Sequence, residues 1–192
     1  MELAPSVIAY LALLLLVAAL RIFELRVSRG HQQQMLARGA KKIVDPKFRW
    51  MVLVHTGVLL GSACEVVFLK RPLLPALAAV MFVLFLAANA MRWWVIRTMG
   101  QHWNVQVVDS TQLGVVTSGP FRYVRHPNYA AVFVEMLALP LIYTAWITAT
   151  LGALAHVIVL VQRLTAEERV LLASADYRTA MGAKPRFLPG IF

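Results

Sequence analysis

The sequence is poor in charge and almost without cysteine. Only 15% of its 192 residues are charged, while 60% are hydrophobic, against about 45–50% apolar residues in a soluble domain. One soluble core of this size could not bury so much apolar surface, so the composition predicts a membrane protein. The single cysteine, Cys64, lies in an apolar run, which excludes a disulfide framework and a cysteine metal cluster. We expect it to be a small core side chain.

Motifs of soluble nucleotide-binding folds are also missing. No two glycines stand two residues apart, so there is no G-x-G, and no P-loop occurs. The net charge is +10, from nineteen basic and nine acidic residues. The basic residues flank apolar runs and form no separate basic domain. We therefore expect charged loops beside a membrane and no nucleic-acid partner.

Three apolar runs are long enough for helices that cross a bilayer, which takes roughly 20 residues. They cover about residues 4–23, 50–69 and 73–97. No basic segment precedes the first run and no small-residue cleavage site follows it. We interpret it as a retained span and not as a signal peptide.

A fourth apolar region, about residues 129–161, is too long for one span. It contains Pro140, and proline disrupts a helix and restricts the residue before it. Two helices joined near residues 143–146, tilted or unusually short, fit better than the alternative of one long kinked helix. The sequence thus predicts five spans.

Lysine and arginine gather in three polar segments. Three basic residues lie in the segment after the third run, and five lie in the tail from Arg163 onward. Between the second and third runs there are only two, Lys70 and Arg71. With five spans the three segments share one side, which the positive-inside rule makes the cytosol. The first segment carries eight: Arg21, Arg26, Arg29, Arg38, Lys41, Lys42, Lys47 and Arg49.

Two polar constellations could carry chemistry. Residues 119–129, GPFRYVRHPNY, alternate aromatic side chains with two arginines and a histidine where a polar loop enters the fourth apolar region. Composition alone equally allows an interfacial belt of tyrosines and arginines. Arg163 and Glu167 stand four residues apart on one helix face. Taken singly, they could be an ordinary surface ion pair.

Together the two segments resemble the paired signature of the isoprenylcysteine carboxyl methyltransferase family and related membrane methyltransferases. That signature is an R-H-P-x-Y turn, a helical hairpin, and R-x-x-x-E-E-x-x-L on the last helix; here the latter reads RLTAEERVL. The resemblance covers roughly residues 90–190. It implies an all-α integral membrane protein of about five transmembrane helices, with a cytosolic cofactor-binding loop and a C-terminal helix closing the cofactor pocket. Residues 1–97 would then be the N-terminal transmembrane helices and 98–192 the methyltransferase core.

The resemblance implies S-adenosylmethionine as the cofactor and no metal. Glu167 matches the carboxylate that holds this cofactor, and Arg163 the residue placed at the acceptor; these are the candidate catalytic residues. Phe121 stands where many relatives have tyrosine, so a hydroxyl contact is lost there and Tyr123 is the candidate to replace it. Ala131 stands where relatives often have glycine, two residues after the motif tyrosine. The positions assigned to the cofactor are Gln106, Leu113, Gly114, Val115, Val116, Phe121, Tyr123, His126, Pro127, Asn128, Tyr129 and Glu167.

The acceptor implied is a lipidic small molecule that enters sideways from the bilayer. A carboxylate needs no general base, and Arg163 could favour the anion of an enol or phenol. The sequence looks most like short prokaryotic members found beside type III polyketide synthases, which favours O-methylation of an alkylpyrone or alkylresorcinol in a bacterial cytoplasmic membrane. Carboxyl methylation of a prenylcysteine and N-methylation of a phospholipid or amine remain alternatives.

Two further alternatives belong to other classes of protein. An NADPH-dependent membrane reductase can carry the R-H-P-x-Y turn, although Arg163 and Glu167 argue against it. A non-catalytic scaffold or lipid-binding protein would bind neither cofactor. We expect instead that Glu167→Ala weakens S-adenosylmethionine binding and that Arg163→Ala mainly lowers turnover.

Ionisable residues inside membrane runs are functional suspects by default. Glu65, Glu135 and His156 are such residues. Glu65 lies near a span end, where its side chain could snorkel to the interface. Glu135 either borders an acceptor tunnel or has a structural ion partner. We expect His55 and His102 to be interfacial or packing histidines.

Overall fold

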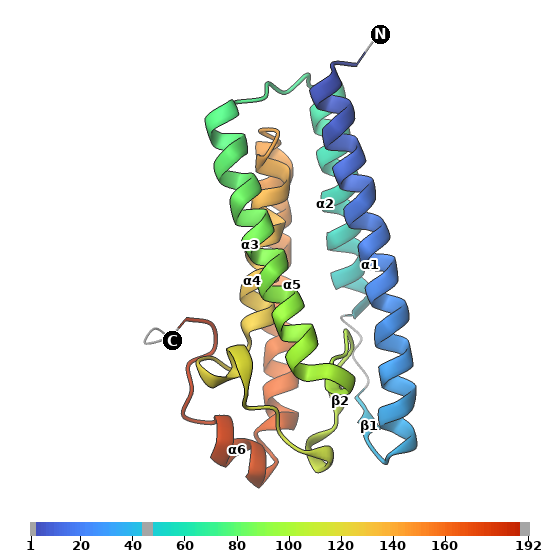
Figure 1. The fold of residues 1–192 in the computed structure, drawn as a ribbon, viewed down its shortest axis with the longest axis vertical. Helices are drawn as coiled ribbons and strands as arrows, with labels where there is room; N and C mark the ends of the chain where they lie inside the picture. The colour runs from blue at the N-terminus through green and yellow to red at the C-terminus, as the bar shows by residue number, and fades with distance from the viewer. Residues whose placement is uncertain (1–2, 44–47, 189–192) are drawn as a thin grey trace.

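The computed structural model describes residues 3–43 and 48–188. Five helices run up and down along one axis (Figure 1). They are α1 (Pro5–Ala37), α2 (Phe48–Phe68), α3 (Pro75–Met99), α4 (Pro127–Leu141) and α5 (Trp146–Leu171), followed by the short α6 (Ala175–Met181). The all-α prediction is confirmed.

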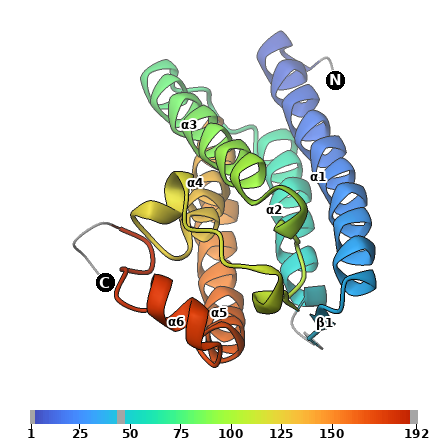
Figure 2. The ribbon, with the colours of Figure 1, turned by 60° about the horizontal axis from the view of Figure 1, so that its bottom comes forward.

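The long connection between α3 and α4 is built from short elements. A two-residue strand, β2 (Val108–Asp109), pairs antiparallel with β1 (Lys41–Lys42) in the α1–α2 connection. The other elements are the 3-10 turns η1 (Gly100–His102), η2 (Thr111–Leu113) and η3 (Gly119–Arg122). Figure 2 shows this connection crossing one end of the bundle, beside α6.

Within the described residues, four helices are long and apolar enough to cross a membrane: α1, α2, α3 and α5. The predicted break near residues 143–146 is confirmed, since α4 ends at Leu141 and α5 begins at Trp146. However, α4 has only 15 residues, about 22 Å at 1.5 Å per residue, against a hydrocarbon core of about 30 Å. Among the described residues α4 is therefore the unusually short member of the predicted pair, and α5 is full-length. Pro140 lies in the last turn of α4, immediately before the break.

Two predicted helix ends were wrong. α1 continues to Ala37, well beyond the expected end near residue 23, because its polar second half is rich in helix-forming residues. α5 continues unbroken through Arg163 to Leu171. The part of the expected C-terminal helix that begins at residue 163 is thus a continuation of α5, and α6 follows it as a short separate helix.

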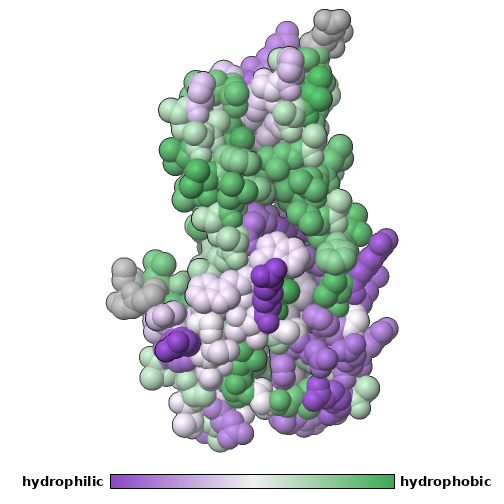
Figure 3. Space-filling model, in the orientation of Figure 1, coloured by the Kyte–Doolittle hydropathy of each residue, from purple (hydrophilic) through white to green (hydrophobic). Residues whose placement is uncertain are grey.

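The molecule is polarised along its long axis. In Figure 3 a hydrophobic surface covers the upper half of the visible face and hydrophilic side chains gather over the lower half. The up-and-down order of the helices brings the three basic segments to the same lower end, with Lys70 and Arg71 at the other (Figure 1). This grouping was predicted from the sequence. Lys47, counted in that prediction, lies outside the described residues.

The upper end of the bundle is tightly closed. Tyr10, Leu14 and Val17 of α1 pack against buried residues of α2, α3 and α4. The Tyr10 hydroxyl donates to the carbonyl of Leu139 at 3.0 Å. Apolar packing therefore fills this end of the bundle.

Glu65 caps a helix and does not snorkel. It is buried, and its carboxylate accepts hydrogen bonds from the backbone N–H groups of Ile147 (3.1 Å) and Thr148 (2.7 Å), in the first turn of α5. Arg71 pairs with it at 2.8 Å. The first N–H groups of a helix have no partner inside that helix, so this carboxylate fixes where α5 starts. Cys64 beside it is exposed and not a core side chain.

Candidate functional site

A cavity of about 570 Å³ extends from the polar loops into the helical bundle. Its loop end is lined by residues of the α3–α4 connection, and its deep end by side chains of α1, α2, α4 and α5. The surfaces that line it are mainly apolar, with a few polar groups, as in small-molecule sites.

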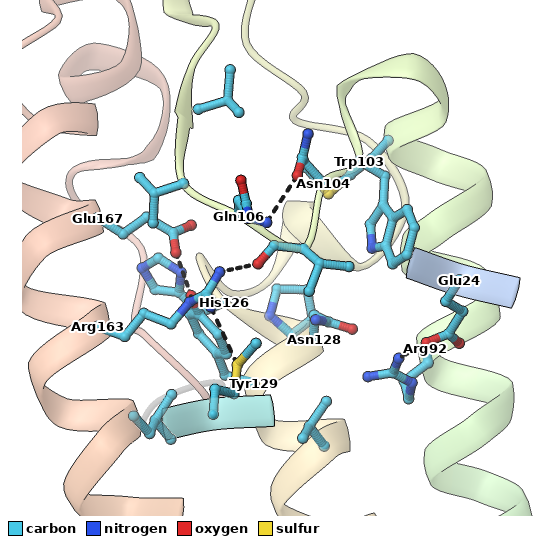
Figure 4. A pocket seen from close by; sticks show the side chains of 18 of the residues that line it. Glu24, Arg92, Trp103, Asn104, Gln106, His126, Asn128, Tyr129, Arg163 and Glu167 are labelled. Carbon is cyan, nitrogen blue, oxygen red and sulfur yellow. Dashed lines mark hydrogen bonds and ion pairs between the residues drawn. The ribbon is translucent and has the colours of Figure 1, made fainter. Parts of the chain in front are cut away.

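The start of α4 and the last turns of α5 lie side by side and form one wall of the cavity. Pro127 opens α4, where its fixed φ suits the first helical position and its missing N–H costs nothing. This start brings the hydroxyl of Tyr129 to the end of α5, where it donates a short hydrogen bond to Glu167. The Nε of Arg163 donates to the same hydroxyl at 3.2 Å. Figure 4 shows the three side chains meeting at the cavity.

Arg163 also ties α5 to the loop and to α2. It is buried, one Nη donates to the carbonyl of Val105, and the other contacts the sulfur of Met51 at 3.2 Å. Its guanidinium lies 6.0 Å from the centre of the Phe48 ring. A planar cation with several donors can hold these partners together.

The loop that carries Val105 is held by the polar half of α1. The hydroxyl of Ser28 accepts from the N–H of Val105 at 2.9 Å and donates to the side-chain oxygen of Asn104 at 3.0 Å. The side-chain amide of Gln32 donates to Gln106 at 3.1 Å. The unpredicted extension of α1 therefore positions the loop side of the cavity.

The two adjacent glutamates on α5 have different surroundings. Glu167 faces the cavity, whereas Glu168 is buried and points to the other side, where it pairs with Arg125 (3.2 Å) and Arg186 (2.8 Å). The Nε2 of His126 lies 3.2 Å from the same carboxylate. Successive residues on a helix point about 100° apart, which separates the two carboxylates.

The C-terminal tail completes this cluster. Pro185 and Arg186 accept backbone hydrogen bonds from Arg125 and His126, each at 2.9 Å. Burial lowers the pKa of His126, although the nearby carboxylates of Glu167 and Glu168 act in the opposite direction. The hydrogen bonds to Glu168 raise the pKa of Arg186. In the neutral His126 ring, Nε2–H donates to Glu168 and Nδ1 is left as an acceptor.

Most of the predicted site residues line the one cavity. Two do not: Leu113 is outside its lining, and Tyr123 is 58% exposed and borders a separate apolar hollow between α3 and α4. Tyr123 therefore cannot replace a hydroxyl at Phe121. Those that the structure brings together are Gln106, Gly114, Val115, Val116, Phe121, His126, Pro127, Asn128, Tyr129, Arg163 and Glu167.

Sequence reasoning missed a charged network at the deep end of the cavity. Glu24 of α1 pairs with Arg92 of α3 at 2.6 Å, and Glu135 of α4 pairs with Arg21 of α1 at 2.7 Å. All four side chains contribute to the cavity lining. The signal was present, because Arg92 lies within a predicted span, where an unpaired charge would be costly. Glu135 thus lines the cavity and has a structural ion partner, while a role beside an acceptor stays a prediction.

Two amide groups of the lining have polar atoms with no partner. The Nδ2 of Asn104 and the Oδ1 of Asn128 are buried and make no hydrogen bond among the described residues. Buried polar atoms are normally paired. A donor and an acceptor left open in the same cavity suit a ligand that presents both kinds of group.

Comparison with known proteins gives a match to one family over part of the chain. Residues 79–173, just under half of the chain, match the isoprenylcysteine carboxyl methyltransferase (ICMT) family. Members of this family are membrane methyltransferases that use S-adenosylmethionine as methyl donor. The matched segment contains the R-H-P-N-Y turn, the α4–α5 hairpin and both glutamates of α5.

The similar proteins include two bacterial ones. The uncharacterized protein YpbQ of Bacillus subtilis is 26% identical over 151 residues, which cover 79% of this chain and 89% of that protein. An uncharacterized protein of Haemophilus influenzae is 25% identical over 157 residues, covering 81% and 90%. Neither description names an activity.

A solved structure shares the fold. It is that of the eukaryotic intramembrane Ras methyltransferase ICMT, with a TM-score of 0.55 and 21% identity. The match covers 78% of this chain and 55% of the eukaryotic one, so this chain spans about half the length of that enzyme. This likeness supports an all-helical membrane fold.

Proposed function

We propose that this chain transfers a methyl group from S-adenosylmethionine to an oxygen of a lipid-like acceptor. The observation that carries the proposal is the junction of Tyr129, Arg163 and Glu167 in a cavity that joins polar loops to membrane-embedded helices. A methyl donor that is water-soluble and an acceptor that is lipidic need a site open to both phases.

The residues of the loop end fit the cofactor. Glu167 offers a carboxylate to an ammonium or sulfonium charge, and Tyr129 and Trp103 line the same cavity with aromatic rings that attract cations. The open atoms of Asn104 and Asn128 offer one donor and one acceptor, which suits an adenine edge. When bound, S-adenosylmethionine supplies an electrophilic methyl group attached to a positively charged sulfur.

The protein's own contribution to the reaction is positioning, exclusion of water and charge. Methyl transfer neutralises charge, so an apolar lining that excludes water favours it. Arg163, fixed by Tyr129 and Val105, would hold the acceptor oxygen as its anion beside the donor. A carboxylate, an enol or a phenol fits this role, because none needs a strong general base.

The acceptor class follows from the lining of the deep end, which is apolar except for the paired charges. An alkylpyrone or alkylresorcinol is our first candidate, and a prenylcysteine-type carboxylate is the alternative. The descriptions of the similar proteins say nothing of polyketide synthases, so that association stays a prediction. The basic residues at the loop end support a cytosolic active site, by the positive-inside rule.

The deciding experiment is calorimetric titration of the detergent-purified protein with S-adenosylhomocysteine, with NADPH as the control ligand. We expect binding of the first alone, and a loss of at least about tenfold in affinity in Glu167→Gln, because one charge-assisted contact contributes about 1.5–3 kcal/mol. Thr165→Ala, an exposed substitution on the same helix, is the matched control. Binding of NADPH alone would reassign the chain to the reductases and remove the roles given to Arg163 and Glu167.

A further inference from the structure

The membrane-embedded part of the cavity contains two histidines that face each other. His55 projects from α2 and His156 from α5, and both line the cavity. Their ring centres are 5.5 Å apart in an edge-to-face arrangement. His156 is 3% exposed and packs on Phe133 of α4.

His156 lacks a polar partner in the part of the chain that the structure describes. Its Nε2 is buried without a hydrogen bond, and its ring contacts are with His55 and Phe133 only. Leaving a buried polar group unpaired costs about 1–3 kcal/mol. Leucine or phenylalanine would fill the same space on α5 at no such cost, so packing alone does not explain a histidine here.

His55 offers one further open atom. Its Nδ1 lies 2.7 Å from the carbonyl of Met51, and since a carbonyl can only accept, this nitrogen carries the proton. The neutral ring therefore has Nε2 as an acceptor. Two acidic residues of the cavity lining, Glu24 and Glu135, are already paired with arginines.

We propose that His156, assisted by His55, is a subsite that binds an uncharged hydroxyl group of the acceptor, separate from the oxygen that is methylated. This inference rests on the proposed function and names a feature of its substrate. The hydroxyl would accept from the Nε2–H of His156 and donate to the open Nε2 of His55. An anionic group could only accept, and a plain hydrocarbon chain could do neither.

The position of the subsite sets where that hydroxyl lies. Met51 contacts Arg163 through its sulfur at 3.2 Å and His55 through its carbonyl at 2.7 Å. His55 follows Met51 by four residues on α2 and His156 precedes Arg163 by seven residues on α5, about 6 Å and about 10 Å along the two helix axes. Two oxygens on one elongated acceptor would reach Arg163 and His156 together.

The test compares two synthetic amphiphiles with the same alkyl chain: a 5-alkylresorcinol with two ring hydroxyls and a 3-alkylphenol with one. Binding of each to the full chain in nanodiscs is measured by thermal shift without cofactor, and S-adenosylhomocysteine binding is measured in parallel. We expect the wild type to bind the resorcinol about tenfold more tightly, the value of one buried hydrogen bond. In His156→Phe this preference should disappear while S-adenosylhomocysteine affinity is unchanged.

His156→Gln keeps a donor and an acceptor and should retain part of the preference, which separates recognition from packing. Leu154→Phe, on an exposed position of the same helix, should behave as the wild type. Equal binding of both amphiphiles by the wild type, or an unchanged preference in His156→Phe, would overturn the subsite. Failure of S-adenosylhomocysteine binding in a wild type that still prefers the resorcinol would reject the proposed function and leave the subsite standing.

Discussion

Replacing Glu168 by glutamine should destabilise the R-H-P-N-Y turn (residues 125–129) without changing a side chain that lines the cavity. The carboxylate of Glu168 is the common partner of Arg125, His126 and Arg186, which belong to the loop, the start of α4 and the C-terminal tail. Glutamine has nearly the same shape but carries no charge. The substitution therefore removes the charge that gathers three separate segments and adds an amide that cannot accept from all of them.

The magnitude follows from the exposure of the partners. Breaking a fully buried ion pair costs about 3–5 kcal/mol. Arg125 is 13% exposed here, but Arg186 is 37% exposed and can regain water. We therefore expect a loss near 2–3 kcal/mol, below that range. At about 2–4 °C per kcal/mol for a chain of this size, the melting temperature should fall by about 5–10 °C.

The assay is thermal unfolding in detergent together with calorimetric titration of S-adenosylhomocysteine, for Glu168→Gln and Glu167→Gln side by side. We expect Glu168→Gln to lower the melting temperature and to weaken binding only modestly. Glu167→Gln should weaken binding strongly with little change in melting temperature, because Glu167 faces the cavity. The reverse pattern, or an unchanged melting temperature in Glu168→Gln, would refute the division of roles between the two glutamates.

Three further changes test the fold around the site. Glu65→Ala should lower the melting temperature, because it removes the cap of α5 at a cost of about 2 kcal/mol. The control Cys64→Ala, at the exposed neighbouring position, should leave the melting temperature unchanged. Equal effects of the two substitutions would exclude the cap. Since burial lowers the pKa of His126 below 6.5, the neutral ring's contribution to stability is complete above about pH 6.5 and is lost as pH falls through the lowered pKa. The melting temperature should therefore drop more between about pH 7 and 5 in the wild type than in His126→Asn, and parallel curves would contradict this. Gly119 has φ +57°, and a Cβ there would lie 2.5 Å from the Thr98 hydroxyl. Gly119→Ala should therefore destabilise the fold by about 1–3 kcal/mol in the same assay, and adding Thr98→Ala should recover part of the loss. Full stability of Gly119→Ala would show that the turn adapts.

Hydropathy and charge along the chain were enough to predict the helical membrane fold. The apolar runs predicted five membrane helices, and Pro140 marked the break between α4 and α5. The distribution of Lys and Arg predicted which segments share one end of the bundle. Most of the residues predicted from the paired signature around His126 and Glu167 line the cavity. These features are local in the sequence, because helix length, helix breaking and residue spacing need only neighbouring residues to be recognised.

The tertiary structure decided which of these side chains meet. Only packing shows that the polar half of α1 holds the loop through Ser28, that Glu168 turns away from the cavity while Glu167 faces it, and that Arg92 is paired with Glu24. It also removes Tyr123 from the site. The direction of a side chain and the partner it finds depend on how distant helices pack against each other, and no periodicity within one helix specifies that.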